Sequence, residues 1–220
     1  MKQLYFDVAH LFAGGLVLAS FVLLYQDRMS GLINVFTVQA ILLSFSVGWQ
    51  AHIQREPHLY VTAAIALIFK ALVIPLSLQN MIERMRIHRE IEVVGGIGMT
   101  MLLGIALVAL SLVVVLPATA AADPLAREDI AFALSVVLLG LLMMVTRRNA
   151  VSQVIGFMSL ENGLILAATG AKGMPFVVEI SVAFSVLIAF IVIGIFLFRI
   201  RERFDTVDLQ ELDRVRGEQR

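Results

Sequence analysis

Seven long apolar segments, separated by short polar stretches, run through almost the whole chain. They lie at residues 8–26, 29–51, 59–82, 93–116, 130–146, 149–171 and 175–198. A helix needs about 20 apolar residues to cross a bilayer, and only helices or closed barrels satisfy their backbone hydrogen bonds there. The segments lack the alternation of barrel strands. The pattern predicts an all-α, polytopic transmembrane helical bundle of about seven spans over residues 1–204, followed by a polar tail, 205–220.

The composition agrees with a membrane protein and excludes several kinds of chemistry. Of the 220 residues, 60% are hydrophobic and 15% are charged, and the mean hydropathy is +0.91. No polar stretch reaches the roughly 50 residues that a separate soluble domain needs. The absence of cysteine excludes disulfides, thiolate-bound iron–sulfur clusters and thiol catalysis. Equal numbers of basic and acidic residues, 17 of each, argue against a nucleic-acid partner.

Basic residues in the short loops predict the orientation. Nine arginines follow the first, third, fifth and seventh segments: Arg28, Arg84, Arg86, Arg89, Arg147, Arg148, Arg199, Arg201 and Arg203. Four basic residues lie on the other side: Lys2, Arg55, Arg127 and Lys172. The side richer in Lys and Arg faces the cytoplasm. The N-terminus is therefore predicted outside, and the C-terminus with its polar tail is predicted in the cytoplasm.

Glu161 is the one charged residue between Asn149 and Ala171. At about 1.5 Å per residue it lies some 18 Å into its segment, near the middle of the membrane. An ionisable group at that depth costs at least about 2.5 kcal/mol. It therefore needs a basic partner, a proton or water.

Lys70 is the predicted partner, because it lies about eleven residues from either end of the third segment, too deep to reach the interface easily. Pro75 cannot donate a backbone hydrogen bond and disfavours the bond to the Ala71 carbonyl, so an irregular helix is expected beside Lys70. An ion pair with Glu161 that opens and closes has the bistability that a proton relay needs. The alternative is a static pair that only fixes helix packing.

Other polar residues in the apolar segments are weaker candidates for the same proton path. Asn162 directly follows Glu161, Glu179 lies a few residues inside the last segment, and Ser185 lies below it. Gln39 is expected to form an interhelical hydrogen bond. The histidines share no ligand spacing, so no metal site is predicted, and no phosphate-binding, hydrolytic or nucleophile motif is present.

Three stretches resemble the E-type membrane subunit of hydrogenase-4 and related complexes. They are IFKALVIPL from residue 68, TRRNAVSQVIGFMSLENG from residue 146 and VEISVAFSVLIAFIVIGIFLFRIRERFDTVDL from residue 178. The resemblance covers most of the chain and is strongest from Thr146 onward. The last three spans, within residues 129–204, are also similar to the small K subunit of respiratory complex I and to the C subunit of multisubunit cation/proton antiporters. The pattern in these subunits is an arginine–arginine–asparagine turn, here Arg147, Arg148 and Asn149, with one membrane glutamate per helix and a tail that ends near a D-x-x-x-E segment.

Two positions depart from the K-type pattern. There the glutamate comes earlier, where this chain has Met158, and Glu161 lies one turn later on the same face. The second acid of that pattern falls near Ser185, which cannot ionise. Glu179, about two turns earlier, is the candidate replacement. The resemblance therefore does not carry over a complete proton wire.

The resemblance implies a non-catalytic membrane subunit, without metal or cofactor, of an energy-converting hydrogenase-4-like oxidoreductase in a bacterial or archaeal cytoplasmic membrane. Its expected partners are antiporter-like and other membrane-arm subunits, a soluble nickel–iron hydrogenase-like or other redox arm, and membrane lipid. It would contribute to proton translocation coupled to electron transfer in other subunits. The alternatives are a subunit of a multisubunit cation/proton antiporter, a stand-alone small transporter, and a structural membrane scaffold.

Overall fold

The chain folds into long helices. The computed structural model describes residues 2–85, 93, 95–120 and 124–170, together with 183, 187, 188, 191 and 194. The helices are α1 (Lys2–Tyr25), α2 (Met29–Gln54), α3 (Pro57–Ile65), the π-helix η1 (Ala66–Val73), α4 (Ile74–Met85), α5 (Gly96–Ala118), α6 (Pro124–Thr146) and α7 (Ala150–Gly170). Almost all of the seventh predicted span, the tail 205–220 and most of the loop after α4 lie outside the described residues.

Within that part of the chain, six helical stretches are long and apolar enough to cross a bilayer. One of them combines α3, η1 and most of α4, which follow one another without a break, and it extends from Pro57 to Asn80. The others lie in α1, α2, α5, α6 and α7. These helices confirm the helical membrane fold that the apolar pattern predicts.

The fifth predicted span begins earlier than the apolar pattern indicates. The pattern predicts a start at residue 130, but α6 begins at Pro124 and includes Arg127, Glu128 and Asp129. This polar run looks like a loop in the sequence. Proline is nevertheless favoured in the first turn of a helix, where its missing N–H has no intrahelical partner to lose. The earlier start brings Asp129 into the bundle.

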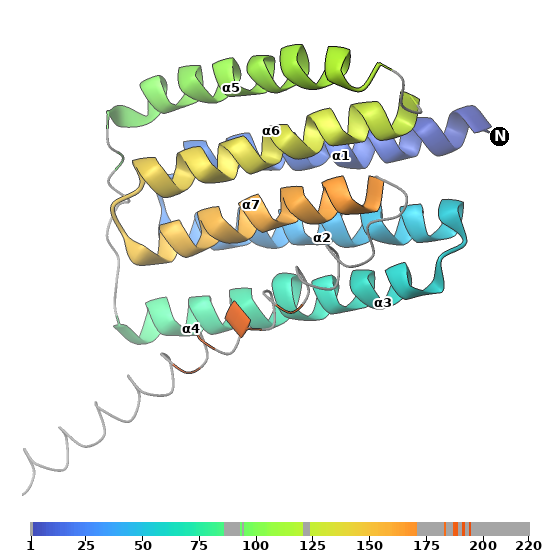
Figure 1. Cartoon of the computed structure of the whole chain (residues 1–220). Coiled ribbons are helices and arrows are strands. Elements are labelled where there is room, and N and C mark those ends of the chain that lie inside the picture. The colour runs from blue at the N-terminus through green and yellow to red at the C-terminus, as the bar shows by residue number, and fades with distance from the viewer. Residues whose placement is uncertain are drawn as a thin grey trace, which may run out of the picture.

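Four helices, α1, α2, α6 and α7, surround the centre of the bundle (Figure 1). α1 packs against α2 and α6, and α7 packs against the same two helices. α5 lies outside α1 and α6, whereas the continuous helix α3–η1–α4 packs against α2 at the opposite side of the bundle (Figure 1). The two outer helices therefore flank a four-helix centre.

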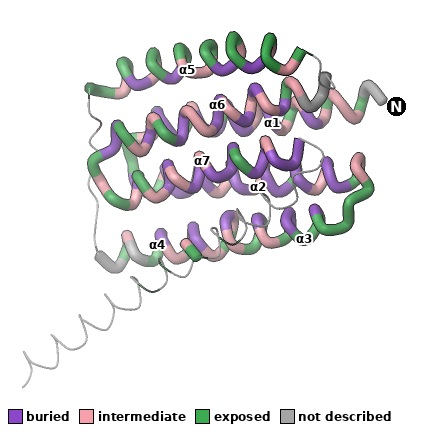
Figure 2. Tube along the Cα trace, viewed as in Figure 1, coloured by how far each residue is buried: buried purple, intermediate pink, exposed green. Residues whose placement is uncertain are grey.

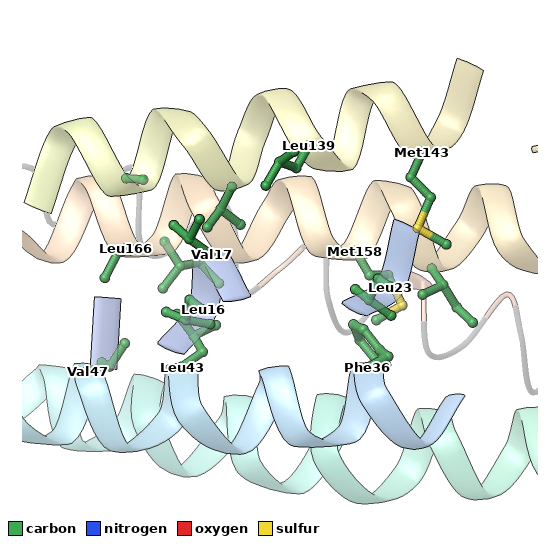
Figure 3. Close-up of a cluster of buried hydrophobic side chains, with 14 of the residues drawn as sticks. Leu16, Val17, Leu23, Phe36, Leu43, Val47, Leu139, Met143, Met158 and Leu166 are labelled. Carbon is green, nitrogen blue, oxygen red and sulfur yellow. The ribbon is translucent and has the colours of Figure 1, made fainter. Parts of the chain in front are cut away.

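Apolar side chains fill the space between these four helices. Leu16, Phe36, Leu43, Leu139 and Met158 are among those that are almost completely buried (Figure 3). Since every one of the four helices contributes to this cluster, any polar group inside it is separated from water. The burial of polar side chains in the same region therefore requires partners within the protein.

The outward surface of the bundle is apolar as well. Along α5 the outer face is exposed (Figure 2), and it carries Met99, Leu102, Ile105 and Val113. Soluble monomers rarely expose so continuous an apolar surface. A surface of this kind is typical of a helix that lies within a membrane, against lipid or another subunit.

α6 and α7 approach each other closely, because glycines line their contact. A Cβ atom built on Gly163 would lie 2.8 Å from the carbonyl oxygen of Ala133 and from the backbone nitrogen of Val137. Small residues allow such backbone approach between membrane helices. The contact fixes the part of α7 that carries the predicted functional residues.

Candidate functional site

Lys70 reaches the centre of the bundle from the π-helix η1, and its side chain is completely buried. The π-helical register is seen in the hydrogen bond from the Ile74 N–H to the Phe69 carbonyl. Pro75 follows directly and has no N–H to donate to the carbonyls four or five residues before it. The irregularity expected next to Pro75 thus takes the form of a π-helical stretch, a feature found frequently at functional sites.

Lys70 forms an ion pair with Glu161 of α7. The distance from Nζ to Glu161 Oε2 is 3.1 Å, and the two side chains are 0% and 4% exposed. Nζ also donates a hydrogen bond of 2.8 Å to Asn162 Oδ1. The structure therefore brings together the pair that the sequence predicts from its shared depth. Pairing matters energetically, because removing one partner of a buried ion pair commonly costs about 3–5 kcal/mol.

Hydrogen bonds continue from this pair to the other central helices. Asn162 Nδ2 donates to Gln39 Oε1 at 3.3 Å, as the expected interhelical role of Gln39 requires. Gln39 Nε2 in turn donates to the hydroxyls of Ser20 at 2.7 Å and Ser159 at 2.9 Å. These six buried residues, which we call the central network, are Ser20, Gln39, Lys70, Ser159, Glu161 and Asn162.

The central network has two low-cost charge arrangements. With Lys70 protonated and Glu161 ionised the pair is neutral overall, and it stays neutral if a proton passes from Nζ to the carboxylate. Neither arrangement places a net charge in the apolar interior, which is the costly condition. The central network is thus chemically able to hold a mobile proton, and equally able to hold α1, α2, η1 and α7 together.

A second group of polar side chains lies where α1 and α6 begin and α2 and α7 end. Asp129 of α6 is 1% exposed, and its Oδ2 accepts a hydrogen bond of 2.8 Å from Gln50 Nε2. Gln54 Nε2 donates both to Gln50 Oε1 at 3.2 Å and to the Thr169 carbonyl at 2.7 Å. We call the group formed by His10, Gln50, Gln54, Glu128, Asp129 and Thr169 the Asp129 cluster.

His10 and Glu128 form the more exposed part of the Asp129 cluster. His10 Nε2 lies 2.8 Å from Glu128 Oε2, with side chains 30% and 49% exposed. Sequence reasoning missed this cluster, because residues 124–129 look like a loop. A usable signal was the helical spacing of Gln39, Ser46 and Gln50, which places all three on one face of α2.

Arg147, in the turn between α6 and α7, is buried at the opposite end of the bundle. Its Nη2 donates to the carbonyls of Leu23, Leu24 and Gln26 at 3.2, 2.7 and 2.8 Å, at the end of α1. Burial lowers the pKa of the Arg147 guanidinium, and the charge of Asp27 opposes this effect. A guanidinium remains protonated in proteins, so Arg147 places a positive charge where the helix dipole of α1 is negative.

The other residues of this turn have different environments. Asn149 Oδ1 accepts a hydrogen bond of 2.7 Å from the Ser152 N–H and so caps the first turn of α7. Arg148 is exposed. The sequence predicts these residues as a cytoplasmic turn but not the burial of Arg147, since neighbouring arginines in a loop give no sign of which one turns inward.

Two predicted members of the proton path, Glu179 and Ser185, lie outside the described residues. Among the residues that the structure does describe, no group of three or more His, Cys, Asp or Glu side chains is arranged to hold a metal ion.

Comparison with known proteins gives relatives over most of the chain. It is 29% identical over 209 residues to the uncharacterized protein Rv0085 of Mycobacterium tuberculosis, covering 93% of this chain and 94% of that protein. It is 30% identical over 161 residues to hydrogenase-4 component E of Escherichia coli, covering 72% of this chain and 74% of the relative. The component E of Shigella flexneri is equally similar. No family model and no solved structure matches the chain.

Proposed function

Since the chain belongs to the hydrogenase-4 component E family, we propose that it is a non-catalytic membrane subunit of a hydrogenase-type oxidoreductase complex. In this function it contributes to proton translocation, while electron transfer takes place in other subunits. The proposal combines two kinds of support. The relatives point to the kind of complex, and the buried ion pair provides a place for a proton.

The single observation that carries the proton-path role is the Lys70–Glu161 contact of 3.1 Å between two almost completely buried side chains. A proton that reaches Glu161 neutralises the carboxylate and releases Lys70, whose ammonium group already donates to Asn162. Loss of a proton from Lys70 then restores a neutral site. One proton enters and one leaves, and no net charge remains in the membrane interior.

The remaining parts of the proposal concern the surroundings of the chain. We expect it in a bacterial or archaeal cytoplasmic membrane, with the N-terminus outside and the C-terminus in the cytoplasm. The expected neighbours are antiporter-like membrane subunits and a soluble nickel–iron hydrogenase-like or other redox arm. Residues 129–204 would be the part that corresponds to the K-type subunit.

The test is the substitution Glu161→Gln in the complete complex, with assembly and proton uptake measured separately. Glutamine retains an oxygen that can accept a hydrogen bond from Lys70 but cannot ionise. We expect normal co-purification of the partner subunits and a fall of at least about tenfold in proton uptake, because a positioned proton-transfer group commonly contributes about a hundredfold or more.

The matched control is Glu83→Gln, which makes the same chemical change at an exposed carboxylate of α4. It is expected to leave both measurements unchanged. Normal proton uptake by an assembled Glu161→Gln complex would reject the relay and leave the structural scaffold as the better explanation. If Glu161→Gln does not assemble, Glu161→Asp, which retains the acid, becomes the informative variant.

A further inference from the structure

Asp129 is a buried acid that the Lys70–Glu161 pair does not account for. Its side chain is 1% exposed, and Oδ2 accepts the hydrogen bond from Gln50 described above. Oδ1 is buried too, and no hydrogen bond to it is found within the described part of the chain. A buried carboxylate oxygen without a donor is costly. A proton or a water molecule at Oδ1 removes that cost.

Two partly exposed titratable side chains lie close to Asp129. The neighbouring Glu128 lies 2.8 Å from His10, and both side chains are partly exposed. His10 and Glu128 are close enough for their charges to act on the Asp129 carboxyl group. Of the elements that pack around this position, α2 and α7 contribute the uncharged Gln50, Gln54 and Thr169, and α5 carries no titratable side chain.

Polar side chains also lead from Asp129 towards the centre. On α2, Gln39, Ser46 and Gln50 are buried and share one face, since they are spaced by seven and four residues. On α7, Asn162 and Thr169 are seven residues apart and both buried. The two helices pack against each other. At about 1.5 Å per residue, Thr169 lies only some 12 Å along α7 from Glu161.

We propose that Asp129 is a second proton carrier, which exchanges protons between the water-exposed His10–Glu128 pair and the Lys70–Glu161 pair. This inference rests on the function proposed above. It names a proton carrier for the end of the proton path that is predicted to face the outside of the cell. Asp129 takes up one proton at Oδ1 from the His10 side and releases one proton to water hydrogen-bonded along the polar faces of α2 and α7, whose amides position that water and do not carry the proton themselves. No electron moves, and the only covalent bonds made or broken are the O–H and N–H bonds of the groups that exchange the proton.

The test compares Asp129→Asn and Asp129→Glu in the complete membrane complex. Asparagine keeps an oxygen that accepts the hydrogen bond from Gln50, whereas glutamate keeps the acid. With normal assembly, we expect proton uptake to fall at least about tenfold in Asp129→Asn and to be largely retained in Asp129→Glu. Asp7→Asn is the matched control, because Asp7 is an exposed acid of α1 near the same end of the bundle. It should leave proton uptake unchanged.

The outcomes separate this inference from the proposed function. Normal proton uptake by an assembled Asp129→Asn complex overturns the inference, and if Glu161→Gln abolishes uptake at the same time, the proposed function stands. Normal uptake by both variants overturns both. If Asp129→Asn does not assemble, the wild-type complex is treated with dicyclohexylcarbodiimide, which modifies protonated carboxyl groups. Modification of Asp129 with parallel loss of uptake supports the inference, and an unmodified Asp129 overturns it.

Discussion

Lys70 brings a positive charge into an apolar bundle, and two neighbouring side chains of α7 compensate for it in different ways. Glu161 supplies the opposite charge. Asn162 accepts a hydrogen bond from Lys70 Nζ and donates one from its own amide group to Gln39. Amide groups exchange protons poorly compared with acids, amines and water. Asn162 and Gln39 are therefore positioning residues, which hold the acid and the amine in register.

The first prediction concerns the energetic coupling of Lys70 and Glu161. Lys70→Met alone should lower the free energy of unfolding by about 3–5 kcal/mol, because it leaves a buried carboxylate without its partner. Lys70→Met combined with Glu161→Gln should cost about 1–3 kcal/mol less than the sum of the single changes. Denaturant unfolding of the full chain in mixed micelles measures all four members of the cycle.

A second cycle provides the control for this coupling. Ser111 of α5 donates a hydrogen bond to the Ala131 carbonyl on the far side of the four-helix centre from η1. Lys70→Met and Ser111→Ala share no partner, so their effects should add to within about 0.5 kcal/mol. Equal additivity in both cycles would contradict an energetic pair of Lys70 and Glu161.

At the scale of helices, the apolar pattern of the sequence predicts where the helices lie. It does not predict how each helix is rotated about its axis or which hydrogen-bond register its backbone adopts. The long apolar runs identify the helices, and Lys70 and Glu161 can be paired because they are the charges at mid-depth. The π-helical register of η1 leaves no hydropathy signal. Asp129 escaped prediction because its burial depends on α6 starting at Pro124 and turning that residue towards α2.

The close contact of α6 and α7 leads to a prediction at this scale. Gly163→Ala places a methyl group 2.8 Å from backbone atoms of Ala133 and Val137, which cannot move aside as a side chain can. The helices must separate, and we expect a loss of about 1–3 kcal/mol in the free energy of unfolding. Because Glu161 and Asn162 lie in the adjoining turn of α7, proton uptake by the complex should fall as well.

Gly14→Ala in α1 is the matched control for this substitution. Nothing lies within 4 Å of the added Cβ atom there. Alanine is the better helix former by about 1 kcal/mol, so the variant should be neutral or slightly more stable. A Gly163→Ala variant as stable as Gly14→Ala would show that α6 and α7 adapt without cost.

In the whole bundle, the three groups of buried polar side chains described above lie at different heights along the bundle axis. Arg147 lies at the end where α1 finishes, the central network lies near the middle of the helices, and the Asp129 cluster lies at the other end. All three join helices of the four-helix centre, while the outer face of α5 is left apolar (Figure 2). These three groups thus follow the bundle axis, which is the direction that the proposed proton path requires.

The direction of that path depends on the orientation in the membrane, which the loop arginines predict with the N-terminus outside. The chain contains no cysteine, so the labelling of a single introduced cysteine shows on which side of the membrane that residue lies. His58 at the start of α3 and Ser30 at the start of α2 are both exposed and lie at opposite ends of the bundle. In spheroplasts, a membrane-impermeant maleimide should label His58→Cys. It should label Ser30→Cys only after the membrane is opened, whereas a permeant maleimide should label both without opening. The reverse pattern would place Arg147 outside and Asp129 on the cytoplasmic side, and Asp129 would then serve the opposite end of the path.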